Sequence, residues 1–182
     1  RSPQAQARPM QLDKLRAEDL PREIEGLAEL LHHCVHAGAS VSFVLPFSMH
    51  DARAYWREQV APGLAAGTRH LIVAHLDGEL VGTVQLALDT PPNQRHRCEI
   101  SKLLVHSDAR RQGVGNKLLV AAERVAKGEG RSLITLDTRR GDGAEALYRG
   151  LGYQIAGIIP RYAKAPDADR FDDTVIMYKE LA

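Results

Sequence analysis

The stretch Arg110-Arg111-Gln112-Gly113-Val114-Gly115 lies between a predicted strand, EISKLLV at 99–105, and a predicted helix that begins at Val114. The first turn of a helix has backbone N–H groups without an intrahelical acceptor, and it carries the positive end of the helix dipole. Two arginines add positive charge, and the two glycines let an anion approach the backbone. The stretch therefore predicts a cradle for a pyrophosphate group.

Two common phosphate-binding patterns do not fit this stretch. The Walker pattern G-x-x-x-x-G-K-[ST] cannot be placed around Gly113 and Gly115. The dinucleotide pattern G-x-G-x-x-G fails because its third glycine would fall at Leu118. The stretch also lies in the middle of the chain, not after a first strand. The sequence thus favours a pyrophosphate ligand of another kind.

The remaining sequence predicts a mixed α/β chain, on apolar periodicity and turn signals. The predicted helices cover 20–35, 48–60, 114–125 and 144–151. The predicted strands cover 70–76, 79–88, 97–105, 133–136, 153–159 and 174–178. Pro62 should kink or end the second helix, and a polar loop should fill 161–173. This order is typical of one mixed sheet with helices on its faces.

Length and composition limit the classes of protein that fit. The 182 residues, 44% hydrophobic and 26% charged, suit one globular domain over 11–182 that follows a flexible tail over 1–10. The net charge of +1 and the aromatic content of 5% give no reason to expect a nucleic acid or membrane partner. The chain has no signal-peptide core and no apolar run of membrane-spanning length, so we expect a cytoplasmic protein.

The arginine–glycine stretch, preceded by its apolar strand, resembles the Q/R-x-x-G-x-G/A loop of the GNAT superfamily of N-acetyltransferases. Downstream, Ala144-Glu145-Ala146-Leu147-Tyr148 with Gly152-Tyr153 is similar to that family's A-x-x-L-Y-x-x-x-G-Y/F element. The resemblance extends from about Leu27 to Leu181. It implies an α/β (α+β) fold with a mostly antiparallel sheet, splayed between its fourth and fifth strands.

The resemblance also implies a cosubstrate, acetyl-CoA, and the residues that bind it. The main chain of Leu103, Leu104 and Val105 would contact the pantetheine arm and the acetyl carbonyl. The pyrophosphate would lie against the loop residues Arg110, Arg111, Gln112, Gly113, Val114, Gly115 and Asn116.

A narrower resemblance concerns the acceptor of the acetyl group. The segments LLHHCVHAGASVSF (30–43), PRYAKAPD (160–167) and MYKEL (177–181) resemble the tabtoxin-resistance acetyltransferases, which act on a small amino-acid-like toxin. This likeness implies direct transfer to a primary amine of a small molecule, with antibiotic or toxin resistance as a role. Protein or peptide acetylation and a catalytically silent acyl-CoA-binding module remain alternatives. Relatives often dimerise, so a homodimer is also implied.

Acetyl transfer to an amine requires a base, an oxyanion donor and a proton for the departing thiolate. Tyr148 falls at the family's tyrosine position, where its hydroxyl would protonate the sulfur of coenzyme A. Glu99 and Asp137 are both candidates for the base, because each lies on or at the end of a strand next to the thioester. Strand alternation would place Glu99 on one face with Ser101 and Leu103.

Other reactive residues carry weaker predictions. Cys98 would point to the face opposite Glu99, which disfavours an acetyl-cysteine intermediate. The histidines of the first helix lack the carboxylate of a H-E-x-x-H motif, so no metal is expected. His36, Ser40 and Tyr162, which lie in or beside predicted loops, are candidates for substrate binding.

Overall fold

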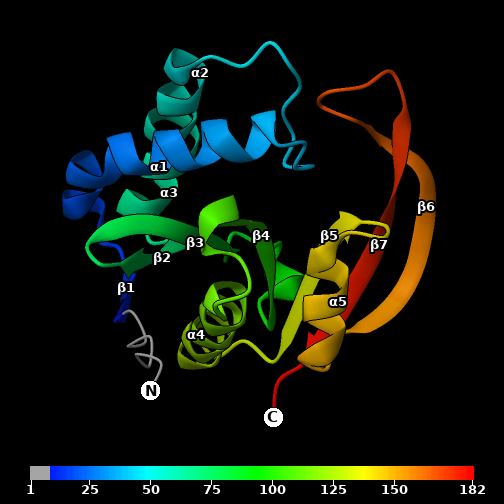
Figure 1. Cartoon of the computed structure of the whole chain (residues 1–182). Coiled ribbons are helices and arrows are strands. Elements are labelled where there is room, and N and C mark those ends of the chain that lie inside the picture. The colour runs from blue at the N-terminus through cyan, green and yellow to red at the C-terminus, as the bar shows by residue number, and fades with distance from the viewer. Residues whose placement is uncertain (1–8) are drawn as a thin grey trace, which may run out of the picture.

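The computed structural model describes residues 9–182, and within them seven strands form one sheet in the order β1-β2-β3-β4-β5-β7-β6 (Figure 1). All neighbours are antiparallel except the parallel pair β4–β5. The strands are β1 Met10–Lys14, β2 Arg69–Leu76, β3 Glu79–Ala87, β4 Arg97–Val105, β5 Leu133–Arg139, β6 Gln154–Lys164 and β7 Phe171–Glu180. The helices are α1 Leu20–His36, α2 Met49–Ala54, α3 Ala61–Ala66, α4 Val114–Gly128 and α5 Gly143–Gly150, with a π-helical segment η2 at Tyr55–Val60 and 3-10 turns η1 Ala17–Asp19, η3 Pro92–Gln94 and η4 Ser107–Ala109.

Helices cover both faces of the sheet, as the sequence predicts. Helices α1 to α3 pack on one face, around fully buried residues such as Leu27 and Trp56. Helices α4 and α5 lie on the other face, where Leu118, Leu119 and Tyr148 join a second apolar cluster. These two layers leave strands β4 and β5 between them, in the middle of the molecule (Figure 1).

The N-terminal end differs from the predicted tail. Residues 1–8 of that tail lie outside the described residues, and Met10 is already the first residue of β1. The strand pairs with β2 from Met10 to Lys14 at one edge of the sheet. The sequence did not reveal it because an edge strand of five residues buries too little to show a strong apolar pattern.

The boundaries predicted for the last polar loop are wrong. The predicted loop 161–173 is mostly strand, since β6 runs to Lys164 and β7 starts at Phe171. Strand β6 is exposed on both faces, so it lacks the alternation that identifies a strand. The second predicted helix does end before Gly67, and a π-helical segment interrupts it just before Pro62. Pro62 lies in the first turn of α3, after the π-helical segment, where its missing N–H costs nothing.

The parallel strands β4 and β5 separate after a short contact. They pair only where Arg97–Glu99 lies beside Leu133–Thr135. Beyond this point β4 stays on β3 as far as Val105, and β5 stays on β7 as far as Arg139. The predicted splay between strands four and five is therefore confirmed, and it opens a gap in the middle of the sheet.

Candidate active site

A β-bulge at Lys102 shapes the edge of β4 that borders the gap. Gln85 pairs with Ser101 and Thr83 pairs with Leu104, so β4 has one residue more than β3 between these pairs. Lys102 has a φ of 49°, which is uncommon for a residue with a side chain. An extra residue of this kind bends the strand and re-aims the groups that follow it.

The bulge reverses the side-chain alternation along β4. Before it, Cys98 and Ile100 pack in the cluster under α4, so Glu99 faces the α1 layer. After it, Leu104 belongs to the α1 cluster, and Leu103 packs toward α4. The prediction that Glu99 and Leu103 share a face is thus wrong, because a simple period of two cannot survive an inserted residue.

Leu103, Leu104 and Val105 border the gap with their main chain. Strand β5 no longer pairs with β4 at these positions, so the backbone groups on that side are free of the sheet ladder. Their side chains are core, and Leu104 is only 1% exposed. An extended ligand in the gap would find backbone donors and acceptors there, in the manner of an added strand.

The phosphate loop, residues 110–116, leads from this strand into α4. Arg110, Arg111, Gln112 and Gly113 are all exposed. Arg111 and Gly113 have φ angles of 63° and 78°, which turn the chain sharply into the helix. A Cβ on Gly113 would meet nothing within 4 Å. The exposed first turn of α4 with two neighbouring arginines therefore fits a pyrophosphate group.

The last three residues of this loop, Val114, Gly115 and Asn116, form the first turn of α4. Val114 is buried and Asn116 is exposed. A Cβ on Gly115 would lie 2.8 Å from Cδ2 of Leu147. Gly115 thus lets α5 pack closely against α4, a reason that differs from the predicted approach of an anion.

Histidines at the end of α1 support the start of the phosphate loop. The ring of His33 stacks on that of His106 with centroids 3.9 Å apart. Nε2 of His33 lies 2.7 Å from Oγ of Ser107. The same nitrogen accepts a hydrogen bond from the backbone N–H of Ser107. The pKa of His33 is lowered, mainly by burial and to a smaller extent by the charge of His106. The His33 ring therefore stays neutral and its Nε2 can accept the hydrogen bond. These contacts hold η4 against α1.

Glu99 and Asp137 lie on either side of the point where the strands separate. Glu99 pairs with Thr135, and Asp137 follows two residues later on the same face of β5. The Glu99 carboxylate reaches solvent, but partial burial and then the nearby Asp137 charge raise its pKa. Asp137 accepts a hydrogen bond of 3.4 Å from Oγ1 of Thr174. Two interacting carboxylates at the gap are suited to proton transfer.

Tyr148 lies on α5, on the opposite side of the sheet from Glu99. It is 4% exposed and packs edge-on against Tyr153, with ring centroids 5.5 Å apart. Burial, with a smaller contribution from the Asp137 charge, raises the pKa of Tyr148. The hydroxyl consequently keeps its proton at neutral pH, so it is able to donate a hydrogen bond.

A cavity of about 620 Å³ lies beside the bulge, on the α1 face. Its wall is formed by the loop at residues 37–48 (the acceptor loop), by α2, by the π-helical segment and by Lys102. Phe43 and Phe47 pack together in this wall, with ring centroids 4.7 Å apart. Its lining residues are Ser42, Phe43, Val44, Pro46, Phe47, Asp51, Ala54, Tyr55, Glu58, Gln59 and Lys102.

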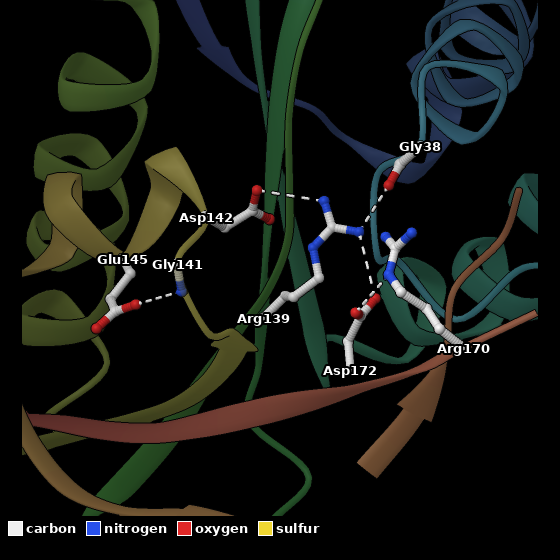
Figure 2. Close-up of polar contacts among 7 residues, drawn as sticks. All are labelled: Gly38, Arg139, Gly141, Asp142, Glu145, Arg170 and Asp172. Carbon is white, nitrogen blue, oxygen red and sulfur yellow. Dashed lines mark hydrogen bonds and ion pairs between the residues drawn. The ribbon is translucent and has the colours of Figure 1, made fainter. Parts of the chain in front are cut away.

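Arg139 ties the acceptor loop to the end of β5. Its guanidinium donates 2.8 Å to the Gly38 carbonyl and 3.3 Å to Asp142 at the start of α5 (Figure 2). It also forms an ion pair with Oδ2 of Asp172 at 3.7 Å, whereas Arg170 donates a hydrogen bond to the other oxygen, Oδ1, of the same carboxylate. A single side chain thus joins α5, β7 and the acceptor loop next to the gap.

The three predicted substrate-binding residues do not line this cavity. Nδ1 of His36 bonds to the His32 carbonyl within its own helix. The chain turns toward the cavity only after Ser40, at Ser42, whose φ is 81°. Tyr162 is 53% exposed on the edge strand β6. Their positions in or near loops carried no information about the direction in which those loops fold.

Neither of the minor alternatives gains support from the geometry. Cys98 is fully buried in the cluster under α4, and burial raises the pKa of its thiol to about 11, which disfavours a thiolate nucleophile. Within residues 9–182, no group of three or more His, Cys, Asp or Glu residues is arranged to bind a metal ion. No helix in the same range is long and apolar enough to span a bilayer.

Four residues at the site were missed by sequence reasoning: Ser42, Tyr55, Lys102 and Arg139. Lys102 offered a signal, since it is the one basic residue inside the mostly apolar strand EISKLLV. The other three act through tertiary contacts that no local pattern records.

Comparison with known proteins agrees with this geometry. The family model for the acetyltransferase (GNAT) family matches residues 27–153. N-acetyltransferase 8B from Rattus norvegicus is 28% identical over 131 residues, which are 64% of this chain and 59% of that protein. The chain therefore matches less than two thirds of the length of this relative.

Solved structures share the fold. The yncA structure from Salmonella typhimurium, which contains its cofactor acetyl-CoA, superposes with a TM-score of 0.74 at 17% identity and covers 96% of this chain and 95% of that one. A ribosomal-protein-alanine N-acetyltransferase from Brucella melitensis gives 0.75 at 21% identity, with 94% and 99% covered. The family match, the splayed strands and the phosphate loop lead to one conclusion: the chain belongs to the acetyltransferase (GNAT) family.

Proposed function

We propose that the protein transfers an acetyl group from acetyl-CoA to a primary amine of a small molecule. The observation that carries this proposal is the gap between β4 and β5, which meets the phosphate loop at one end and two carboxylates at the other. The positive first turn of α4 suits the pyrophosphate, and the free main chain of Leu103–Val105 suits the pantetheine arm and the acetyl carbonyl.

The two proton transfers of the reaction would take place on opposite faces of the sheet, with the candidate base Glu99 on the α1 face and Tyr148 on the α5 face. Acetyl-CoA supplies the activated thioester carbonyl. As the C–N bond forms, Glu99 or Asp137 takes a proton from the amine, directly or through water. As the C–S bond breaks, Tyr148 gives its proton to the departing sulfur. The raised pKa of Glu99 favours its work as a base near neutral pH, and burial keeps Tyr148 protonated.

The cavity beside Lys102 supports a small acceptor. Its volume of about 620 Å³ falls among those of small-molecule sites, and much of its wall is apolar. The narrower likeness to tabtoxin-resistance acetyltransferases, with a role in antibiotic or toxin resistance, belongs to this proposal. A protein or peptide acceptor is the alternative. The two carboxylates and Tyr148 argue against a silent acyl-CoA-binding module.

Location and assembly complete the proposal. The two cysteines are buried and unpaired, as suits a reducing cytoplasm.

A homodimer is supported by β6, an edge strand that exposes Ile155, Ile158 and Ile159. Light scattering would test the dimer, and a purely monomeric protein at high concentration would contradict it.

A thiol-release assay over a panel of amines tests the activity. We expect release of coenzyme A that depends on both acetyl-CoA and a small amine, together with thermal stabilisation by acetyl-CoA and coenzyme A that exceeds stabilisation by ATP. Stabilisation without thiol release on any amine or peptide would indicate the silent module. Release with peptides alone would favour the protein or peptide acceptor.

A further inference from the structure

Lys102 is a half-buried cation that forms no ion pair among the described residues. Its ammonium lies 3.4 Å from Oγ of Ser42 and 5.4 Å from the centre of the Tyr55 ring. Lys102 takes part in none of the ion pairs found among residues 9–182, so the charges of Asp137 and Glu99, which favour its charged form, act on it at longer range. Removal of a charge from water is costly unless another group compensates for it. An anion bound in the cavity would provide that compensation.

Tyr55 supplies a second donor at the same place. A chain of hydrogen bonds runs from Arg69 to Gln85, at 2.6 Å, and from the Gln85 amide to the Tyr55 hydroxyl, at 2.9 Å. Because Tyr55 accepts in this chain, its own proton is left for another acceptor. Burial raises the pKa of Tyr55, so the hydroxyl stays protonated. The Ser42 hydroxyl is a third donor, beside the Lys102 ammonium and the Tyr55 hydroxyl.

The other charges of the cavity limit what can bind. Of the described residues that line it, Lys102 is the one cation, and Asp51 and Glu58 are both acidic. The Asp51 carboxylate already accepts the backbone N–H of Ser48 in the cap of α2. A ligand with several negative charges would be repelled by these acids, so one carboxylate group suits the cavity best.

The position of Lys102 also fixes where that carboxylate lies. The bulge immediately precedes Leu103–Val105, whose main chain borders the gap proposed for the thioester. A carboxylate on Lys102 must therefore be only a few bonds from the amine that attacks. We propose that the acceptor is an amino acid, whose carboxylate is bound by Lys102 Nζ, Ser42 Oγ and the Tyr55 hydroxyl, with its side chain against Phe43 and Phe47. This inference rests on the proposed acetyl transfer and names its substrate class.

Matched pairs of amino acids and their carboxamides would test the inference, since each pair differs only in the anionic group. With the wild-type protein, we expect thiol release to favour the amino acid of at least one pair. In Lys102→Met, the KM for that amino acid should rise about 10- to 100-fold, the value of one hydrogen bond to a charged group. The KM for its carboxamide, the KM for acetyl-CoA and the kcat should change little, and Lys102→Arg should restore much of the preference.

Three controls keep the test decisive. Lys127→Met removes an exposed lysine at the end of α4 and should change nothing. If Lys102→Met does not fold, Tyr55→Phe and Ser42→Ala each remove one donor and should weaken the preference by smaller factors. Equal turnover of both members of every pair, or an undiminished preference in Lys102→Met, would overturn the inference and leave acetyl transfer intact. Failure to bind acetyl-CoA would instead overturn the proposed function.

Discussion

The phosphate loop and the acceptor loop lie at two ends of one site, but they are specified in different ways. The phosphate loop is proposed to bind through its backbone, at the junction of a strand and a helix, so seven consecutive residues suffice to identify it. The acceptor loop is held in place by residues that lie far from it in the sequence. Arg139 bonds to its Gly38 carbonyl, and its Leu45 N–H donates to the carbonyl of Pro166, between β6 and β7. A local motif identifies the first loop, whereas only the fold reveals the second.

Removal of both candidate bases should lower turnover more than any other change. It should affect the chemical step and leave binding unchanged. We expect Glu99→Gln with Asp137→Asn to lower kcat about 10²- to 10⁴-fold, because general-base catalysis contributes that much. The rising limb of the pH–rate profile should disappear, and the affinity for acetyl-CoA should stay the same. A double variant that keeps the limb would show that neither carboxylate is the base.

Tyr148→Phe should have the next largest effect, and it probes the half of the site that the sequence predicts. We expect kcat to fall about 10- to 100-fold, since one hydrogen bond to the developing thiolate is lost. Binding of acetyl-CoA, measured by calorimetry, should change little because the ring remains packed against Tyr153. Unchanged turnover would exclude the acid role.

Arg139→Ala probes the half that only the structure reveals. The variant loses its bond to the Gly38 carbonyl, so the acceptor loop should loosen, with a cost of about 1–3 kcal/mol in the free energy of unfolding. The KM for the acceptor should rise while that for acetyl-CoA holds. Arg140→Ala is the matched control, since its pair with Asp173 is exposed and worth about 0–1 kcal/mol. Equal effects of the two variants would contradict the assigned role of Arg139.

Asp137→Asn alone should produce the smallest change, a shift in pH dependence. Glu99 has a raised pKa, due first to burial and then to the Asp137 charge. If Glu99 is the base, removal of that like charge lowers its pKa, so the rising limb should move to lower pH. A limb that instead vanishes in Asp137→Asn would identify Asp137 as the base.

Periodicity and turn signals within short segments predicted most of the strands, and the family resemblance implied the splayed sheet; the cofactor-binding residues stay a prediction. The sequence could not predict the bulge at Lys102, since one inserted residue leaves no trace in the apolar pattern of EISKLLV. The sequence predicted the same role for Gly113 and Gly115, the close approach of an anion. In the structure Gly113 borders open space, whereas a Cβ on Gly115 would meet Leu147. Lys102, Tyr55 and Ser42 come together only through the packing of three separate elements.

Calorimetric titration with acetyl-CoA tests the contrast between the two loops most directly. In Arg110→Ala with Arg111→Ala, the affinity should fall about 10- to 100-fold, because charge-assisted contacts to the pyrophosphate are lost. In Lys102→Met, on the acceptor side, the wild-type affinity should persist. Equal loss in both variants, or a wild-type protein that binds acetyl-CoA no better than ATP, would contradict the assignment of the Arg110–Gly115 loop to coenzyme A.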